Sequence, residues 1–142
     1  MGVGYLSFSM KSHRIRKPPT DNQGWKRVYK QAEKAVHMAY VEHLREFYDI
    51  EIIHLVNEGQ LPPQYRKQLL ALGLRPGASD LLCLWSGQGI LFHELKAISG
   101  KISGRQKNFD ERVTSFGFIC ITTYGLDEAK QVPDKYGFPK RP

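Results

Sequence analysis

The chain has 142 residues, of which 41% are hydrophobic and 25% charged, so it is long enough for one globular domain with its own core. No apolar run approaches the ~20 residues of a membrane span, and the N-terminus lacks the basic start and apolar core of a secretory signal. Cys83 and Cys120 lie far apart outside any CxxC motif, which argues against a zinc site or a disulfide framework. We therefore expect a cytoplasmic protein without a membrane partner.

The charge balance favours a polyanionic partner. The net charge is +7 and the isoelectric point about 9.5, and nucleic acid is the simplest partner of that kind. Residues 1–24 carry no periodic signal and include a basic stretch from Lys11 to Lys17. This basic N-terminal arm is equally compatible with a solvated tail and with contacts to phosphates.

The first regular element is a helix. From Trp25 to Phe47 apolar residues recur at steps of three and four, which predicts a helix with one buried face, on which Trp25, Tyr29, Tyr40 and Phe47 are expected to be core residues. Glu33 lies at the edge of that face, whereas Glu42 falls on the polar side. An acid at a core edge is either paired or functional. The position of Glu33 on the helical wheel, taken alone, favours a structural salt bridge.

The β-rich run from Ile50 to Val56 predicts the first strand. Pro63–Leu72 is compatible with a short helix that has proline in its first turn. A glycine- and proline-containing turn then leads to Asp80, and Leu81–Trp85 predicts the second strand.

A hairpin is predicted next. Ser86–Gly89 supplies the glycines of a tight turn, and Ile90–Lys96 is the third strand. Ser103 with Gln106 three residues later is a capping-box signature, so a helix should run from there to about Ser115.

The C-terminal part supplies one more strand and one more helix. Phe118–Thr122 is the predicted strand, and Asp127–Val132 is a short helix that Pro133 is expected to stop. Residues 135–142 are predicted to be a loosely held tail. The element order indicates an α/β fold in which helices flank a mixed central sheet.

Chemistry is concentrated between Asp80 and Lys96. Side chains two residues apart on a strand point to the same face, so Glu94 and Lys96 project together. An antiparallel hairpin also brings the start of its first strand next to the end of its second. The sequence therefore predicts that Asp80, Glu94 and Lys96 converge.

Two close carboxylates repel each other, and a divalent cation is the simplest way to relieve that repulsion. Oxygen ligands suit Mg²⁺ or Mn²⁺, which can polarise a phosphate and activate a water molecule, and a nearby lysine can offset charge in the transition state. This pattern favours metal-assisted phosphodiester hydrolysis. The competing interpretation is an ordinary ion pair on a wet strand face.

Three segments resemble a known family: Pro76–Leu82, His93–Lys96 and Gly100–Gln106. Their sequences and combined spacing look like the VRR-NUC domain of the PD-(D/E)XK nuclease superfamily. The resemblance runs from about residue 33 to residue 132 and implies a restriction-endonuclease-like fold. The expected organisation is the arm (1–24), a nuclease domain (25–134) and the tail (135–142).

The resemblance also implies roles for individual residues. Asp80 and Glu94 would be metal ligands, with the Leu95 carbonyl as a further ligand. Lys96 would be the catalytic lysine, and Glu33 would complete both the catalytic and the metal-binding set. The cofactor would be Mg²⁺ or Mn²⁺.

Two positions depart from the family pattern. Ser79 stands where proline usually precedes the aspartate, which should be tolerated because proline there mainly shapes the turn. His37 stands where a glutamine usually follows the first acid, so the role of this position is open. Gln106 is as well explained by capping its helix as by substrate contact. The residues expected to contact DNA are Arg75, Lys101, Arg105, Gln106 and Lys107.

Stand-alone proteins of this family occur in phages and bacteria and are similar to dimeric Holliday-junction resolvases. The resemblance therefore implies an endonuclease that cuts branched DNA as a homodimer. A nuclease for flaps or other branched DNA and a non-catalytic basic DNA-binding module are the alternatives. Leucines 69, 70, 72 and 74 are one candidate dimer surface, although core packing would explain them equally well.

Overall fold

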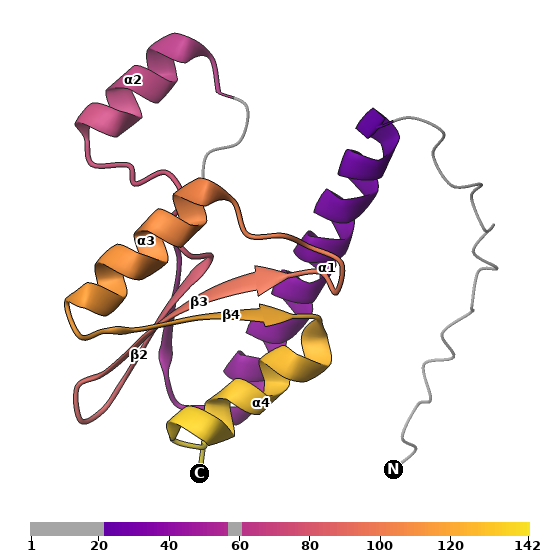
Figure 1. Ribbon diagram of the computed structural model, residues 1–142. Helices are drawn as coiled ribbons and strands as arrows, with labels where there is room; N and C mark the ends of the chain where they lie inside the picture. The colour runs from indigo at the N-terminus through magenta and orange to yellow at the C-terminus, as the bar shows by residue number, and fades with distance from the viewer. Residues whose placement is uncertain (1–21, 57–60) are drawn as a thin grey trace, which may run out of the picture.

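A computed structural model describes residues 22–56 and 61–142, and its centre is a four-stranded mixed sheet flanked by helices (Figure 1). The predicted fold class is confirmed. Residues 1–21, most of the basic arm, lie outside the described part of the chain, as do residues 57–60.

The sheet has the strand order β1-β2-β3-β4. Its strands are β1 (Glu51–His54), β2 (Leu81–Trp85), β3 (Gly89–Lys96) and β4 (Ile119–Tyr124). The first three pair antiparallel, and β4 pairs parallel with β3. The parallel pair needs a crossover, which the helix between β3 and β4 provides.

The first helix, α1 (Asn22–Phe47), starts three residues earlier than its periodicity predicts. Tyr40 and Leu44 on its apolar face are fully buried, as expected. Phe47 was expected in the core but is 49% exposed, because the helix ends there and the next residue turns into the core instead. The described side chains do not include those of Trp25 and Tyr29.

Three further helices complete the fold: α2 (Pro63–Ala71), α3 (Gly104–Ser115) and α4 (Leu126–Tyr136). The helices α1 and α4 pack together on one face of the sheet, and α3 covers the other (Figure 1). The predicted capping box of α3 is confirmed, since Ser103 Oγ accepts from the Gln106 amide and Gln106 Oε1 accepts from the Ser103 amide.

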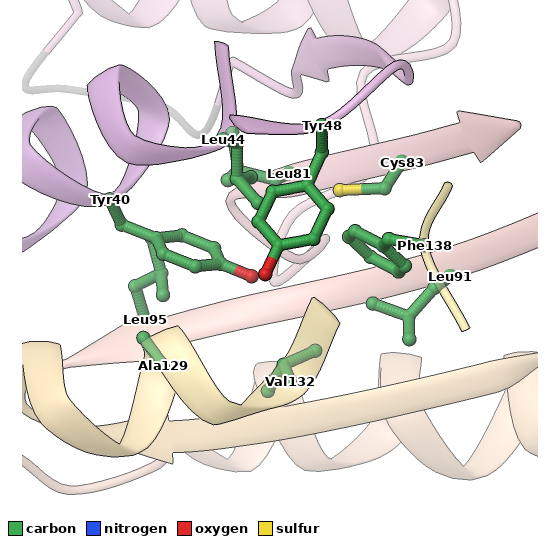
Figure 2. Packing of buried hydrophobic residues seen from close by; sticks show 10 residues of the cluster. All are labelled: Tyr40, Leu44, Tyr48, Leu81, Cys83, Leu91, Leu95, Ala129, Val132 and Phe138. Atoms are coloured by element: carbon green, nitrogen blue, oxygen red, sulfur yellow. The ribbon is translucent and has the colours of Figure 1, made fainter. Parts of the chain in front are cut away.

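The main core lies between the sheet and the α1–α4 pair (Figure 2). Its buried residues come from both helices, from β2 and β3 and from the C-terminal segment: Tyr40, Leu44, Tyr48, Leu81, Cys83, Leu91, Leu95, Ala129, Val132 and Phe138. A smaller cluster under α3 contains Ala78, Phe109 and Val113. Both faces of the sheet are thus covered.

The helix α4 continues past Pro133, so the prediction that this proline stops the helix is wrong. Proline removes one backbone hydrogen bond, but Pro133 is fully buried among the core residues, and burial offsets that loss. The helix ends instead at Gly137, which has a φ of 75° that suits glycine.

The C-terminal segment is docked rather than loosely held. Phe138 is only 4% exposed and packs against Trp85, with 4.6 Å between the ring centroids. The Asp49 amide donates to the Pro139 carbonyl at 2.8 Å, and the Arg141 amide donates to the Phe47 carbonyl at 3.0 Å. The aromatic side chain at position 138 therefore anchors the tail. The proline-rich sequence of the tail does not indicate this anchoring.

The helix α2 stands away from the sheet (Figure 1) and has no buried residue. Leu70 and Leu72 are exposed, the latter by 77%, so core packing does not explain them. Within the described residues, no helix is both long and apolar enough to cross a membrane.

We predict that Phe138→Ala lowers the free energy of unfolding by about 3–5 kcal/mol, because it empties a buried aromatic site. The matched control is Phe116→Ala, since Phe116 is 59% exposed and its loss should cost less than about 1 kcal/mol. Urea unfolding followed by circular dichroism measures both. Equal effects of the two variants would contradict the assignment of the tail to the core.

Candidate active site

Asp80 and Glu94 are brought together by the open end of the β2–β3 hairpin. Leu81 pairs with His93 in the antiparallel register, so Asp80, one residue earlier, comes opposite Glu94. The turn at the other end uses positive φ angles at Gly87 and Gln88. The predicted juxtaposition of the two acids is confirmed.

The approach to Asp80 is held in place by a close contact with α3. Gly77 has a φ of 81°, and a Cβ atom there would collide with the backbone of Arg105. The next two residues, Ala78 and Ser79, are buried. Only glycine permits this approach, which positions Asp80 relative to the start of α3.

Asp80 is fixed by two neighbouring strands. Its Oδ2 accepts a hydrogen bond from the Leu95 amide at 2.8 Å, and its backbone carbonyl lies 3.1 Å from His54 Nδ1. The N–H and C=O of a strand residue face the same side, so the Leu95 carbonyl is also turned toward Asp80. The carbonyl predicted as a metal ligand therefore faces one of the two acids.

Glu94 is a buried carboxylate with an incomplete set of partners, being only 4% exposed. Its Oε1 accepts from Gln106 Nε2 and lies 3.1 Å from Lys96 Nζ, whereas no described residue hydrogen-bonds to Oε2. Burial, followed by repulsion from Asp80, raises the pKa of Glu94 to about 7, although Lys96 opposes this shift.

Lys96 is the cation of the cluster and is 6% exposed. Its Nζ lies 3.1 Å from Glu94 Oε1 and 3.6 Å from Glu33 Oε1. Burial alone would lower the pKa of Lys96, but the two glutamates and Asp80 together raise it above the ordinary value. The ammonium group therefore remains charged at neutral pH.

Glu33 reaches the cluster from α1, as its position at the edge of the apolar face suggested. Gly100 makes room for it, because a Cβ atom there would lie 3.1 Å from Glu33 Oε1. The ion pair with Lys96 agrees with the salt bridge that the helix wheel favoured. Its metal-binding and catalytic roles stay predictions.

The donor set suits a hard divalent cation in part. Asp80 and Glu94 offer carboxylate oxygens, Glu94 Oε2 lacks a partner among the described residues, and the Leu95 carbonyl faces the same side. Within residues 22–56 and 61–142, however, no group of three or more His, Cys, Asp or Glu side chains is arranged to hold a metal ion. Two carboxylates and one carbonyl fit a cation such as Mg²⁺ that keeps several water ligands.

The histidines near the cluster differ in role. His93 is fully buried and forms a 2.7 Å hydrogen bond with Thr123 Oγ1, so it is part of the packed interior. Burial lowers its pKa to about 3, so it is neutral. His54 is exposed and lies beside Asp80 and His37. Only the pairing of β1 with β2 reveals this position, so no local signal predicts it.

The residues predicted to contact DNA surround the start of α3. Lys101, Arg105 and Lys107 are exposed there, whereas Gln106 is engaged by Ser103 and Glu94. Arg75 is exposed as well, and its guanidinium lies 5.8 Å from the Phe109 ring centroid. Their contacts with DNA stay predictions, while the bond from Gln106 to Glu94 was not anticipated.

Comparison of the whole fold with solved structures gives a consistent result. One chain described as a "VRR_NUC domain protein" superposes with a TM-score of 0.59 at 18% identity, covering 74% of this chain and 87% of its own. Another, a "VRR_NUC domain", gives a TM-score of 0.56 at 19% identity and covers 74% and 97%. The fold is that of a VRR_NUC domain. No protein-family model and no curated protein matches the sequence.

The VRR_NUC likeness confirms the fold that the three sequence segments suggested. At 18–19% identity it concerns the fold alone, so chemistry must be argued from the side chains. Those side chains are the buried Glu94 and Lys96 and the half-buried Asp80, grouped at the open end of a hairpin.

The raised pKa of Glu94 predicts an unusual pH dependence of stability. The folded state keeps the Glu94 proton up to about pH 7, whereas the unfolded state releases it above 4.5. Because the folded state then binds more protons between these values, stability falls as the pH rises through this window, by at most about 3 kcal/mol. Glu94→Gln mimics the protonated acid and should remove this contribution.

Urea unfolding of both proteins at pH 5, 6, 7 and 8 in EDTA measures the effect. The two should be similarly stable at pH 5, and the variant more stable at pH 8. If the free energies of unfolding of the two proteins change with pH in the same way, the pKa of Glu94 is not raised.

Proposed function

We propose that this chain is a Mg²⁺- or Mn²⁺-dependent endodeoxyribonuclease that hydrolyses phosphodiester bonds in branched DNA as a homodimer. The single observation that carries the proposal is Glu94, buried beside Asp80, with one carboxylate oxygen that no described residue satisfies. Burying such a group is unfavourable unless something binds it. A divalent cation would complete its coordination.

The roles of the residues follow from their contacts. Asp80, Glu94 and the Leu95 carbonyl would hold the cation, which when bound supplies Lewis acidity and an activated water. Lys96, kept charged by Glu94 and Glu33, would offset the negative charge that grows on the phosphate. Gln106 would hold Glu94 in position through its hydrogen bond to Oε1.

DNA as the substrate is supported by the net charge of +7 and by the basic residues around the start of α3. Branched DNA and a homodimer are supported by the resemblance to stand-alone VRR-NUC proteins and by symmetry, because a two-fold dimer matches a four-way junction. The exposed leucines of the α2 region, Leu70 and Leu72, supply a surface that a second copy would cover.

We predict that Mg²⁺ or Mn²⁺ raises the melting temperature of the wild type by several degrees at saturating concentrations. A ligand at about 100 times its Kd stabilises the folded state by about 2.7 kcal/mol. Asp80→Asn and Glu94→Gln should abolish the rise, whereas the control Glu42→Gln, on the exposed side of α1, should keep it. Differential scanning fluorimetry measures all four proteins, and a rise retained in Glu94→Gln would exclude this residue as a ligand.

We also predict that the wild type with metal cuts a labelled four-way junction faster than a flap or a linear duplex, and that Lys96→Ala is slower by about 100-fold or more. Labels on two opposing strands test the dimer, which should make paired cuts at symmetry-related positions. The control Lys130→Ala changes an exposed lysine on α4 and should cut normally.

Three outcomes would count against parts of the proposal. Equal cutting by the wild type and Lys96→Ala would remove the lysine from the mechanism. Faster cutting of flaps would replace the junction as the substrate. Binding of DNA without cutting in any metal would leave a non-catalytic DNA-binding module.

A further inference from the structure

A cleft of about 600 Å³ opens beside Asp80, between α1 and the start of β2. Asp80 and Leu95 lie at one end of this cleft, and Lys30, Lys34 and His37 of α1 line its wall. The cleft therefore joins the candidate active site to a face of α1 that the predicted DNA contacts do not include.

That face of α1 carries a row of exposed cations: Arg27, Lys30 and Lys34. Steps of three and four residues place the three on one side of a helix, and the row is about 10 Å long at 1.5 Å per residue. Within residues 22–56 and 61–142, none of the three forms an ion pair. Lys30 and Lys34 line the cleft, so their charges are available to a ligand there, and Arg27 extends the row beyond it.

Between this row and Asp80 lie two imidazole rings. His37 and His54 meet edge to face, with 4.8 Å between their centroids and 81° between their planes. His54 Nδ1 lies 3.1 Å from the Asp80 carbonyl, which can only accept a hydrogen bond, so Nδ1 carries the proton. The pair is therefore held in place next to the acids and offers flat surfaces on which a base can stack.

We propose that this cleft binds one strand of the DNA on one side of the phosphate that is cut. Arg27, Lys30 and Lys34 would contact successive phosphates, and His37 with His54 would contact the nucleotide next to Asp80. This inference rests on the proposed nuclease function and adds a strand path to it. A row of about 10 Å matches roughly three nucleotides at 3.4 Å per step.

The strand path also accounts for the position of the acids between two basic surfaces. The α1 row belongs to a helix that packs on one face of the sheet, whereas Lys101, Arg105 and Lys107 lie around the start of α3, which covers the other face (Figure 1). Asp80 lines the cleft with Lys30 and Lys34, and Glu94 is bonded to Gln106 at the start of α3, so the two acids lie between the two surfaces. Each surface would then hold one flank of the scissile phosphate.

The test compares Lys30→Gln/Lys34→Gln with the control Lys130→Gln/Lys135→Gln, which changes two exposed lysines of α4. Fluorescence anisotropy measures binding of labelled single-stranded and four-way DNA in EDTA, where no cutting occurs. We expect the α1 variant to bind about tenfold more weakly and to lose about 1.5 from the slope of log K against log salt, because two phosphate contacts disappear. The α4 variant should bind like the wild type.

The histidine pair is tested by His37→Ala and His37→Phe. Loss of the ring should weaken binding about tenfold, while phenylalanine keeps a flat surface and should restore most of it. With metal present, Lys30→Gln/Lys34→Gln and His37→Ala should raise KM and leave kcat within about twofold of the wild type. A fall in kcat with unchanged KM would contradict a strand-binding role, as would a His37→Phe variant no better than His37→Ala.

The same measurements separate the inference from the proposed function. Normal cutting together with wild-type affinity and salt slope in Lys30→Gln/Lys34→Gln would overturn the strand path and leave the nuclease. The opposite result is also informative. If Lys30→Gln/Lys34→Gln binds DNA more weakly but the wild type cuts no DNA with Mg²⁺ or Mn²⁺, the nuclease is overturned and a strand-binding cleft remains.

Discussion

The hairpin of β2 and β3 holds Asp80 and Glu94 side by side, and most of the surrounding structure either enforces or relieves that contact. Burial of Glu94, followed by its repulsion from Asp80, raises the pKa of this glutamate, so holding the two carboxylates together is unfavourable. Each nearby element contributes a compensating group: β3 supplies Lys96, α3 supplies Gln106 and α1 supplies Glu33 to steady the lysine. The compensation is incomplete, because Glu94 Oε2 has no hydrogen-bond partner among the described residues. This unsatisfied oxygen is the physical reason for proposing a cation.

The two ends of this hairpin serve different purposes. At the turn end, Trp85 packs against Phe138, so the C-terminal segment closes the core there. At the open end, Asp80 lines a cleft, and its carboxylate accepts a hydrogen bond from the Leu95 amide. The open end thus carries the polar cluster directly beside the core residues Leu81 and Leu95.

Local patterns predicted the fold well where neighbouring residues decide the structure. The capping box of Ser103 and Gln106, the glycine turn of the hairpin and the α/β order are all confirmed. Two of the errors lie at Pro133 and Phe138, where burial outweighed the local preference for a break and a loose tail. Propensity could not foresee the docking of Phe138, because this residue packs against Tyr48 and Trp85, which are distant in the chain.

The sequence by itself determined that Asp80, Glu94 and Lys96 converge, since strand alternation and hairpin closure are local rules. The tertiary structure alone decided the partners of that cluster. The approach of Gln106 to Glu94 depends on how α3 packs, and the position of His54 beside Asp80 depends on the register of β1 against β2. Such contacts join segments far apart in the chain, and only the packing of the whole core fixes their distances.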